Sequence, residues 1–348
     1  MNAMARSLPK VLLHEHLDGS LRDATLLELL HVRGMRAPAD DVAGLARWFD
    51  ARAHAGSLVE YLRGFELTVA AMAHPEALAR VAFEAAEDSL ADGAVRAEFR
   101  IAPLLFEPFG LAGDEVIEAL VAGLARSPLA SGLIVCAMRH LPPWETERAA
   151  ELAARWAGRG VIGFDLAGAE RGHPATEHAV ALGMAHAAGL PLTLHAGEAD
   201  SAERVIEAAR LGAVRIGHGV HLADALGDPA HAWMIDEARQ RELHFEVCPT
   251  SNVHTGAAAS IASHPITSMW RAGLSLGFNT DNRQMSRISA SSEASALLEQ
   301  TTLGIGDLVA MALEAAHHSF LPQAQRTQAA QAVRDWARSQ GVQPTPRR

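Results

Sequence analysis

Histidines and acidic residues stand at the ends of several short apolar segments of this sequence. His14 and His16 end one segment, within HEHLDGS, and His195, His218 and Asp281 end three others. Residues two apart in a strand point to the same face, so His14 and His16 are expected to point together into the interior. Imidazole and carboxylate groups together suit zinc, iron or nickel better than magnesium or calcium. His14, His16, His195 and Asp281 are therefore a candidate site for a divalent metal.

Each of these residues also has a simpler explanation when it is taken alone. Paired histidines on a strand often only bond backbone carbonyls, and His195 could be an ordinary core histidine. Asp281 could cap the following helix, because aspartate is a good N-cap residue. Four such residues, each at the end of a predicted strand, are hard to explain independently, so the metal site is the preferred interpretation.

Eight short apolar segments alternate with alanine- and leucine-rich helical patterns. Most of them lack polar alternation, as expected of parallel strands buried on both faces. The segments are residues 11–17, 94–102, 132–138, 161–167, 190–195, 215–220, 243–248 and 274–280. This alternation predicts a (β/α)₈ barrel, in which active sites lie at the carboxyl ends of the strands. A doubly wound open sheet is the alternative, but its glycine-rich fingerprint after the first strand is missing.

The interval between the first two predicted strands is too long for one crossover helix. Residues 18–93 are therefore expected to form a helical insertion, on the side of the barrel where active sites lie. The insertion could serve as a lid, or it could merely pack on the outside. After Asp281, extra C-terminal helices are expected to about Ser339, followed by a flexible tail at residues 340–348. Residues 1–348 are interpreted as a single domain.

Composition excludes several classes of protein. The 348 residues carry 30 basic and 41 acidic side chains, a net charge of −11, which argues against a nucleic-acid partner. The two cysteines, Cys136 and Cys248, are too few for a disulfide framework or a multi-cysteine zinc site. No apolar run is long enough to span a membrane, and the first residues lack an apolar signal segment. A cytoplasmic protein with no membrane partner is expected.

The only lysine, Lys10, precedes the first predicted strand. A binuclear hydrolase bridged by a lysine at the end of strand four is therefore excluded, as is a Schiff-base aldolase. Two further expectations concern residues outside the metal set. Glu98 and Arg100, on the second strand, are expected to form an interior ion pair. Residues 249–252 are expected to form a structural turn over the barrel mouth.

Six motifs, taken in order, resemble those of one known family. They are LPKVLLHEHLDGSLR, TLHAGE, RIGHGVHL, EVCPTSNVHTGA, HPI and NTDNRQMS, with weaker similarity at AEFRIAP and GFDLAGAE. The sequence resembles the adenosine deaminase family of metal-dependent amidohydrolases, and most closely its bacterial members. The resemblance implies a barrel that holds one Zn²⁺ per chain. It also implies hydrolytic deamination of adenosine and 2′-deoxyadenosine in purine salvage. Adenosine would give inosine and ammonia.

The resemblance also implies a role for each matching residue. The zinc ligands of the family match His14, His16, His195 and Asp281. Glu198 matches the proton donor to purine N1, and His218 matches the histidine beside the attacking water. Contacts to ribose match His16 and Asp18, and a backbone contact to the purine matches Gly168. The second residue of the family's Asp-Asp pair is Asn282 here, which is expected to donate to purine N7 or else to cap a helix.

The chemistry of these residue types agrees with the implied roles. Zinc lowers the pKa of water from about 15.7 to about 7, which gives a nucleophile at neutral pH. Ring N1 must accept a proton, and Glu198 can supply it if burial keeps its carboxyl protonated. His218 can orient the water or take its proton. The alternative substrates are two related 6-aminopurines, adenine and 6-amino-deoxyfutalosine. The alternative to an enzyme is a metal-binding protein without catalytic activity. Asp18 favours a nucleoside, because it can bond a ribose hydroxyl. No feature of the sequence indicates how many chains the protein assembles.

Overall fold

The computed structural model describes residues 1–53 and 58–347. Residues 54–57 of the predicted insertion and residue 348 of the predicted tail lie outside the described residues. Eight parallel strands form one sheet in sequential order from β1 to β8. The backbone N–H of His16 donates to Asp281 O at 2.8 Å, and that of Asp281 donates to His14 O at 3.0 Å. These bonds join β8 to β1, so the predicted (β/α)₈ barrel is confirmed.

All eight predicted strands are present, with limits that differ by at most a residue or two. Their interior faces are filled by side chains and their outer faces are covered by helices, so nearly every strand residue is buried. The strands are β1 (Lys10–His16), β2 (Ala94–Ile101), β3 (Ser131–Met138), β4 (Val161–Ala167), β5 (Leu192–Ala196), β6 (Ala213–His218), β7 (His244–Val247) and β8 (Ser275–Phe278).

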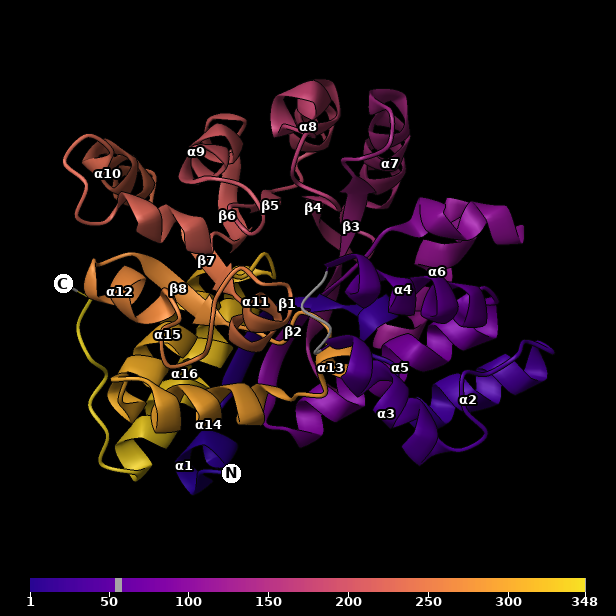
Figure 1. The fold of residues 1–348 in the computed structure, drawn as a ribbon, viewed down its shortest axis with the longest axis horizontal. Coiled ribbons are helices and arrows are strands. Elements are labelled where there is room, and N and C mark those ends of the chain that lie inside the picture. The colour runs from indigo at the N-terminus through magenta and orange to yellow at the C-terminus, as the bar shows by residue number, and fades with distance from the viewer. Residues whose placement is uncertain (54–57, 348) are drawn as a thin grey trace.

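Helices that follow β2 to β7 surround the barrel (Figure 1). They are η2 (Pro103–Phe109), α6 (Gly113–Leu124), α7 (Pro143–Trp156), η3 (Ala175–His178), α8 (Ala179–Ala187), α9 (Ala202–Arg210), η4 (Val220–Ala225), α10 (Ala232–Gln240), α11 (Pro249–His254) and α12 (Ile266–Arg271). Each of the longer helices buries one apolar face. In α9, Val205, Ile206 and Ala209 lie on that face, at the spacing of one side of a helix.

The insertion after β1 is helical, as predicted. It consists of η1 (Leu17–Gly19), α2 (Asp23–Val32), α3 (Val42–Ala53), α4 (Leu58–Met72) and α5 (Pro75–Ala91). Helix α5 packs on the outside against α6 and β2, whereas α4 packs against η1 at the mouth of the barrel. Part of the insertion therefore lies beside the carboxyl ends of the strands. Movement of the insertion as a lid stays a prediction.

Four helices follow β8, and a short helix, α1 (Ala3–Ser7), precedes β1. The C-terminal ones are α13 (Arg283–Ser286), α14 (Ala290–Gln300), α15 (Ile305–His318) and α16 (Gln323–Ser339). Helix α15 covers β8 and β1, and so protects the closure of the sheet. Residues 342–347 form neither helix nor strand, and their flexibility stays a prediction. Within the described residues, no helix is both long and apolar enough to cross a membrane.

Charged side chains fill the interior of the barrel beneath its mouth. Arg100 bonds Asp165 at 2.7 Å and Glu246 at 2.5 Å, and Arg215 bonds Glu246 at 2.6 Å and Glu98 at 2.7 Å. All five side chains are fully buried. The expected pair between Glu98 and Arg100 is therefore wrong. Two residues of one strand lie about 6.6 Å apart along it, and Glu98 and Arg100 pair instead with side chains on other strands.

Candidate active site

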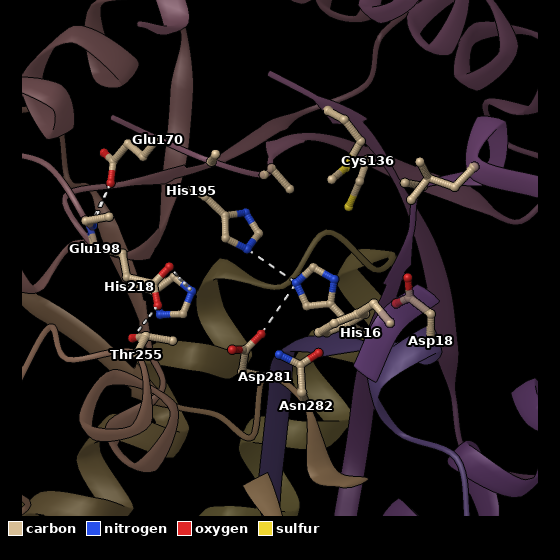
Figure 2. A pocket seen from close by; sticks show the side chains of 18 residues that line it. His16, Asp18, Cys136, Glu170, His195, Glu198, His218, Thr255, Asp281 and Asn282 are labelled. Atoms are coloured by element: carbon tan, nitrogen blue, oxygen red, sulfur yellow. Dashed lines mark hydrogen bonds and ion pairs between the residues drawn. The ribbon is translucent and has the colours of Figure 1, made fainter. Parts of the chain in front are cut away.

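Three histidines and one aspartate converge at the carboxyl ends of the strands. His16 Nε2 lies 3.3 Å from His195 Nε2, and Asp281 Oδ1 lies 3.4 Å from His14 Nε2 and 3.5 Å from His16 Nε2. Figure 2 shows His16, His195 and Asp281 turned toward one another in the pocket. The histidines come from β1 and β5, and Asp281 follows β8. The structure thus brings together the four residues expected to be metal ligands.

The other ring nitrogens of two of these histidines face buried carboxylates. His14 Nδ1 lies 2.9 Å from Glu246 Oε2, and His195 Nδ1 lies 3.0 Å from Asp165 Oδ2. A carboxylate at Nδ1 holds the ring proton there, which leaves Nε2 with an exposed lone pair. Both Nε2 atoms therefore face the centre of the cluster as acceptors. One ring nitrogen from each of His14, His16 and His195 lies within 4.8 Å of the others, an arrangement that suits the ligands of one cation.

The protonation of the cluster also fits a cation. Burial lowers the pKa of His14 to about 4 and holds that of His16 well below its usual value. Burial acts in the same direction on His195, but the Asp165 carboxylate outweighs it and raises the pKa. Burial alone would raise the pKa of Asp281, yet the imidazoles around it hold it well below its usual range. The neutral imidazoles of His14 and His16 beside the ionised carboxylate of Asp281 are donors that divalent zinc prefers.

One buried atom of the cluster has no ordinary hydrogen bond. His14 Nε2 is fully buried, and within the described residues it makes no hydrogen bond of normal geometry. A buried polar atom without a partner is rare, and a missing ion is one of the standard reasons for it. The donor set, its neutral imidazoles and this atom together fit a divalent metal ion.

Glu198 and His218 lie on one wall of the same pocket. Glu198 Oε1 accepts a hydrogen bond from Thr255 Oγ1 at 3.0 Å, and Glu198 Oε2 lies 3.6 Å from His218 Nε2. Glu198 is partly buried, whereas His218 is almost fully buried. Figure 2 shows both side chains across the pocket from His16. The two residues expected to move protons are therefore neighbours beside the metal cluster.

The backbone is left-handed at two of these residues. His218 has φ 62° and Asp281 has φ 57°, although neither residue is glycine. Such conformations are uncommon for residues with a side chain, and they occur most often at functional sites. His218 is the last residue of β6 and Asp281 lies three residues after the end of β8, and at both positions the chain turns into the loop at the barrel mouth.

The pocket above the cluster has a volume of about 890 Å³, part of it open to solvent. Asp18, Gly168 and Asn282 line it, together with Phe65 from α4 of the insertion. Oδ1 of Asp18 and Oδ1 of Asn282 are buried, and neither has a hydrogen-bond partner within the described part of the chain. Burial raises the pKa of Asp18 to about 7. Polar atoms of this kind are available to a bound molecule.

Asn282 does not cap the helix that follows it. It occupies the N-cap position of α13, but its side chain makes no capping hydrogen bond, so the capping alternative is wrong. Gly168 has φ 94°, and a Cβ at this position would lie 2.8 Å from His140 Nδ1. Only glycine fits there without strain, which brings the backbone of residue 168 to the pocket surface.

Several residues around the site were not expected from the sequence. Asp165 and Glu246 bond the histidines expected to be ligands, and Glu170 accepts the four consecutive backbone N–H groups of residues 197–200 at 2.6 to 3.1 Å. Residues 249–252, expected to form a turn, instead begin α11, where Ser251 Oγ donates to Asp281 Oδ2 at 2.6 Å. The sequence signal that could have predicted this helix is Pro249, because proline is favoured in the first turn of a helix.

Comparison with known proteins agrees with the geometry of the site. A family model described as adenosine deaminase matches residues 9–336. The chain is 42% identical over 337 residues to an adenosine deaminase of Mycobacterium tuberculosis, covering 92% of each chain, and 43% identical to that of Mycobacterium leprae over the same shares.

Among solved structures, the apo N6-methyl-AMP deaminase of Arabidopsis thaliana superposes with a TM-score of 0.82. It is 25% identical, and the match covers 97% of this chain and 99% of that one. The family model, the bacterial relatives and the shared barrel agree with one another: the chain belongs to the adenosine deaminase family.

Proposed function

We propose that this protein hydrolyses adenosine and 2′-deoxyadenosine at C6, releasing ammonia, and that it uses one zinc ion per chain. The strongest support is the convergence of His14, His16, His195 and Asp281 in a pocket whose wall carries Glu198. The identity of 42% to curated adenosine deaminases supports the same reaction. Inosine is the product expected from adenosine.

His14, His16, His195 and Asp281 would hold the zinc ion. When bound, zinc supplies a nucleophile at neutral pH, because it lowers the pKa of water to about 7. Asp165 and Glu246 fix the rings of His195 and His14, so that the Nε2 lone pairs point at one place. Ser251 holds the second oxygen of Asp281, which directs Oδ1 toward the histidines.

Glu198 is the proton donor to ring N1. Loss of an amino group from an aromatic carbon requires that C6 become electrophilic, and a proton on N1 achieves this. Thr255 bonds one oxygen of the Glu198 carboxyl, which leaves Oε2 to carry the proton. His218, 3.6 Å from that oxygen, orients the attacking water or takes its proton.

The remaining residues recognise the nucleoside. Asp18 and His16 lie where ribose hydroxyls can be bound, and the unpartnered Asp18 carboxyl is suited to a hydroxyl donor. The side-chain amide of Asn282 donates to purine N7, and the backbone at Gly168 contacts the ring. Asparagine can donate at any pH, whereas aspartate would first have to be protonated.

The charge of the pocket favours a nucleoside over a nucleotide. Its described lining includes four carboxylates and neither lysine nor arginine. The carboxylates are Asp18, Glu170, Glu198 and Asp281. A phosphate on the ribose would find no cationic side chain in this lining. A small purine nucleoside is therefore the proposed partner, and the cytoplasmic location stays a prediction.

A substrate panel tests this function. The zinc-loaded protein is mixed with adenosine, 2′-deoxyadenosine, adenine, 6-amino-deoxyfutalosine or adenosine 5′-monophosphate, and ammonia release is measured. We expect turnover of the first two compounds, lost on treatment with a chelator and restored by zinc. A preference for another compound of the panel would change the substrate. Absence of ammonia from all five would leave a metal-binding protein without this activity.

A further inference from the structure

We propose that Asn252 and His264 hold His218 in the tautomer that carries its proton on Nε2. Neutral His218 then donates a hydrogen bond into the pocket and does not act there as a base. The tautomer follows from hydrogen-bond directions alone, whereas its catalytic meaning rests on the proposed function. The inference decides between the two roles open to His218.

The chain of hydrogen bonds begins at a donor whose direction is fixed. The backbone N–H of Ile266 donates to His264 Nδ1, with the two nitrogens 3.0 Å apart. A ring nitrogen that accepts carries no proton, so neutral His264 has its proton on Nε2. His264 is almost fully buried, and burial lowers its pKa to about 3, which keeps it neutral.

Asn252 lies between His264 and His218 and forms a hydrogen bond with each of them. The Nε2–H of His264 donates to Asn252 Oδ1 at 3.2 Å, which turns the amide nitrogen of Asn252 toward His218. That nitrogen, Nδ2, lies 2.9 Å from His218 Nδ1, and an amide nitrogen can only donate. Nδ1 of His218 is therefore the acceptor. Because Asn252 is fully buried, the amide has no solvent to bond in its place.

The ring proton of His218 consequently faces the pocket. Nε2 is the nitrogen that lies 3.6 Å from Glu198 Oε2, and His218 itself lines the pocket. A nitrogen that already carries a proton cannot accept another, so His218 orients the attacking water by donating to it, and the proton that the water loses passes to the ionised Asp281 carboxylate in the same site. A donor fixed in this position also stabilises the negative charge that the oxygen carries once that proton has left. Asn252 and His264 do not line the pocket, so they are positioning residues.

Magnetic resonance of isotope-labelled histidine tests the tautomer directly. Long-range proton–nitrogen correlations distinguish a protonated from an unprotonated ring nitrogen, and the His218→Gln variant identifies the signals of His218. In the zinc-loaded protein we expect a proton on Nε2 and none on Nδ1. In Asn252→Asp, an oxygen replaces the donor at nearly the same size, so Nδ1 should become protonated. A proton on Nδ1 of the wild type, or no change in Asn252→Asp, would overturn the proposal.

Kinetics test whether Asn252 acts through His218. Asn252→Leu removes the donor at similar size, and kcat should fall about 10²-fold, as when one oriented donor is lost. In a His218→Ala background the same change should cost nothing further, because no ring is left to orient. Equal losses in both backgrounds would mean a merely structural role for Asn252 and would refute the proposal.

A matched control and the spectra keep the outcomes separate. His244 is another buried histidine, bonded through Nδ1 to Ser275 and outside the pocket, so His244→Gln should keep kcat. If Asn252→Leu does not fold, the spectra of the nearly isosteric Asn252→Asp decide the question. If the wild type releases no ammonia from any purine, the proposed function fails, while the spectra still report the tautomer.

Discussion

Glu246 holds the metal cluster and the barrel interior together, and its loss should weaken both. Its carboxylate accepts hydrogen bonds from His14, Arg100, Thr193 and Arg215 at 2.5 to 2.9 Å. In Glu246→Gln the negative charge is lost and one oxygen becomes an amide nitrogen, which faces Arg215 and Thr193 in one orientation and Arg100 and His14 in the other. Either Arg100 or Arg215 is then left in the interior without its hydrogen bond to residue 246.

Two magnitudes follow from these contacts. Removing one partner of a buried charge pair costs about 3–5 kcal/mol, so the free energy of unfolding should fall by about that amount. Loss of the group that orients a ligand histidine lowers metal affinity about 10–100-fold, or about 1.4–2.7 kcal/mol. Denaturant unfolding measures the first quantity, and competition with a fluorescent zinc chelator measures the second.

Glu98→Gln is the matched control for this prediction. Glu98 is also fully buried and also bonds Arg215, at 2.7 Å, but its other partners are Ser319 and Phe320. It should lose stability and keep its affinity for zinc. If Glu246→Gln binds zinc as tightly as Glu98→Gln does, the role of the Glu246 carboxylate charge at His14 is refuted.

Changes at four further residues test the site one residue at a time. His16→Ala should bind no zinc and have no activity, as metal analysis and ammonia release will show. Glu198→Gln should keep its zinc and lose about 10²–10⁴-fold in kcat, and a loss below about tenfold would remove Glu198 from the mechanism. Asn282→Ala should lower kcat/KM for adenosine, and in Asn282→Asp kcat/KM should fall as the pH rises, since only a protonated carboxyl donates. The wild type should prefer adenosine to adenine at least ~10²-fold in kcat/KM, and Asp18→Ala should reduce this ratio.

The barrel could be predicted because its strands are buried on both faces and so appear as continuous apolar segments. The strand limits could not, because they depend on backbone bonding. Strand β5 was predicted to begin at residue 190, but Pro191 has no N–H for the ladder, and the strand begins at Leu192. Strand β6 was predicted to reach residue 220, but the left-handed backbone of His218 ends it.

The residues expected to be metal ligands could be predicted because the carboxyl ends of all eight strands meet at one face. Their partners could not, since Asp165 and Glu246 lie on β4 and β7 with nothing in the sequence to link them to His195 and His14. Only the register of the closed sheet brings them to the same level. The wrong pairing of Glu98 with Arg100 has this origin too.

The left-handed backbones of His218 and Asp281 bear on how this protein could be made more heat-stable. A side chain in that conformation costs about 1–2 kcal/mol, whereas glycine adopts it freely and loses only part of the gain as chain entropy. Glycine at either position would relieve this strain, but it would also remove a residue of the site and a buried hydrogen bond, from Asn252 to His218 or from Ser251 to Asp281. Laboratory evolution for heat stability that reaches glycine at these turns therefore exchanges backbone strain for contacts of the site, and each round would need a screen for turnover.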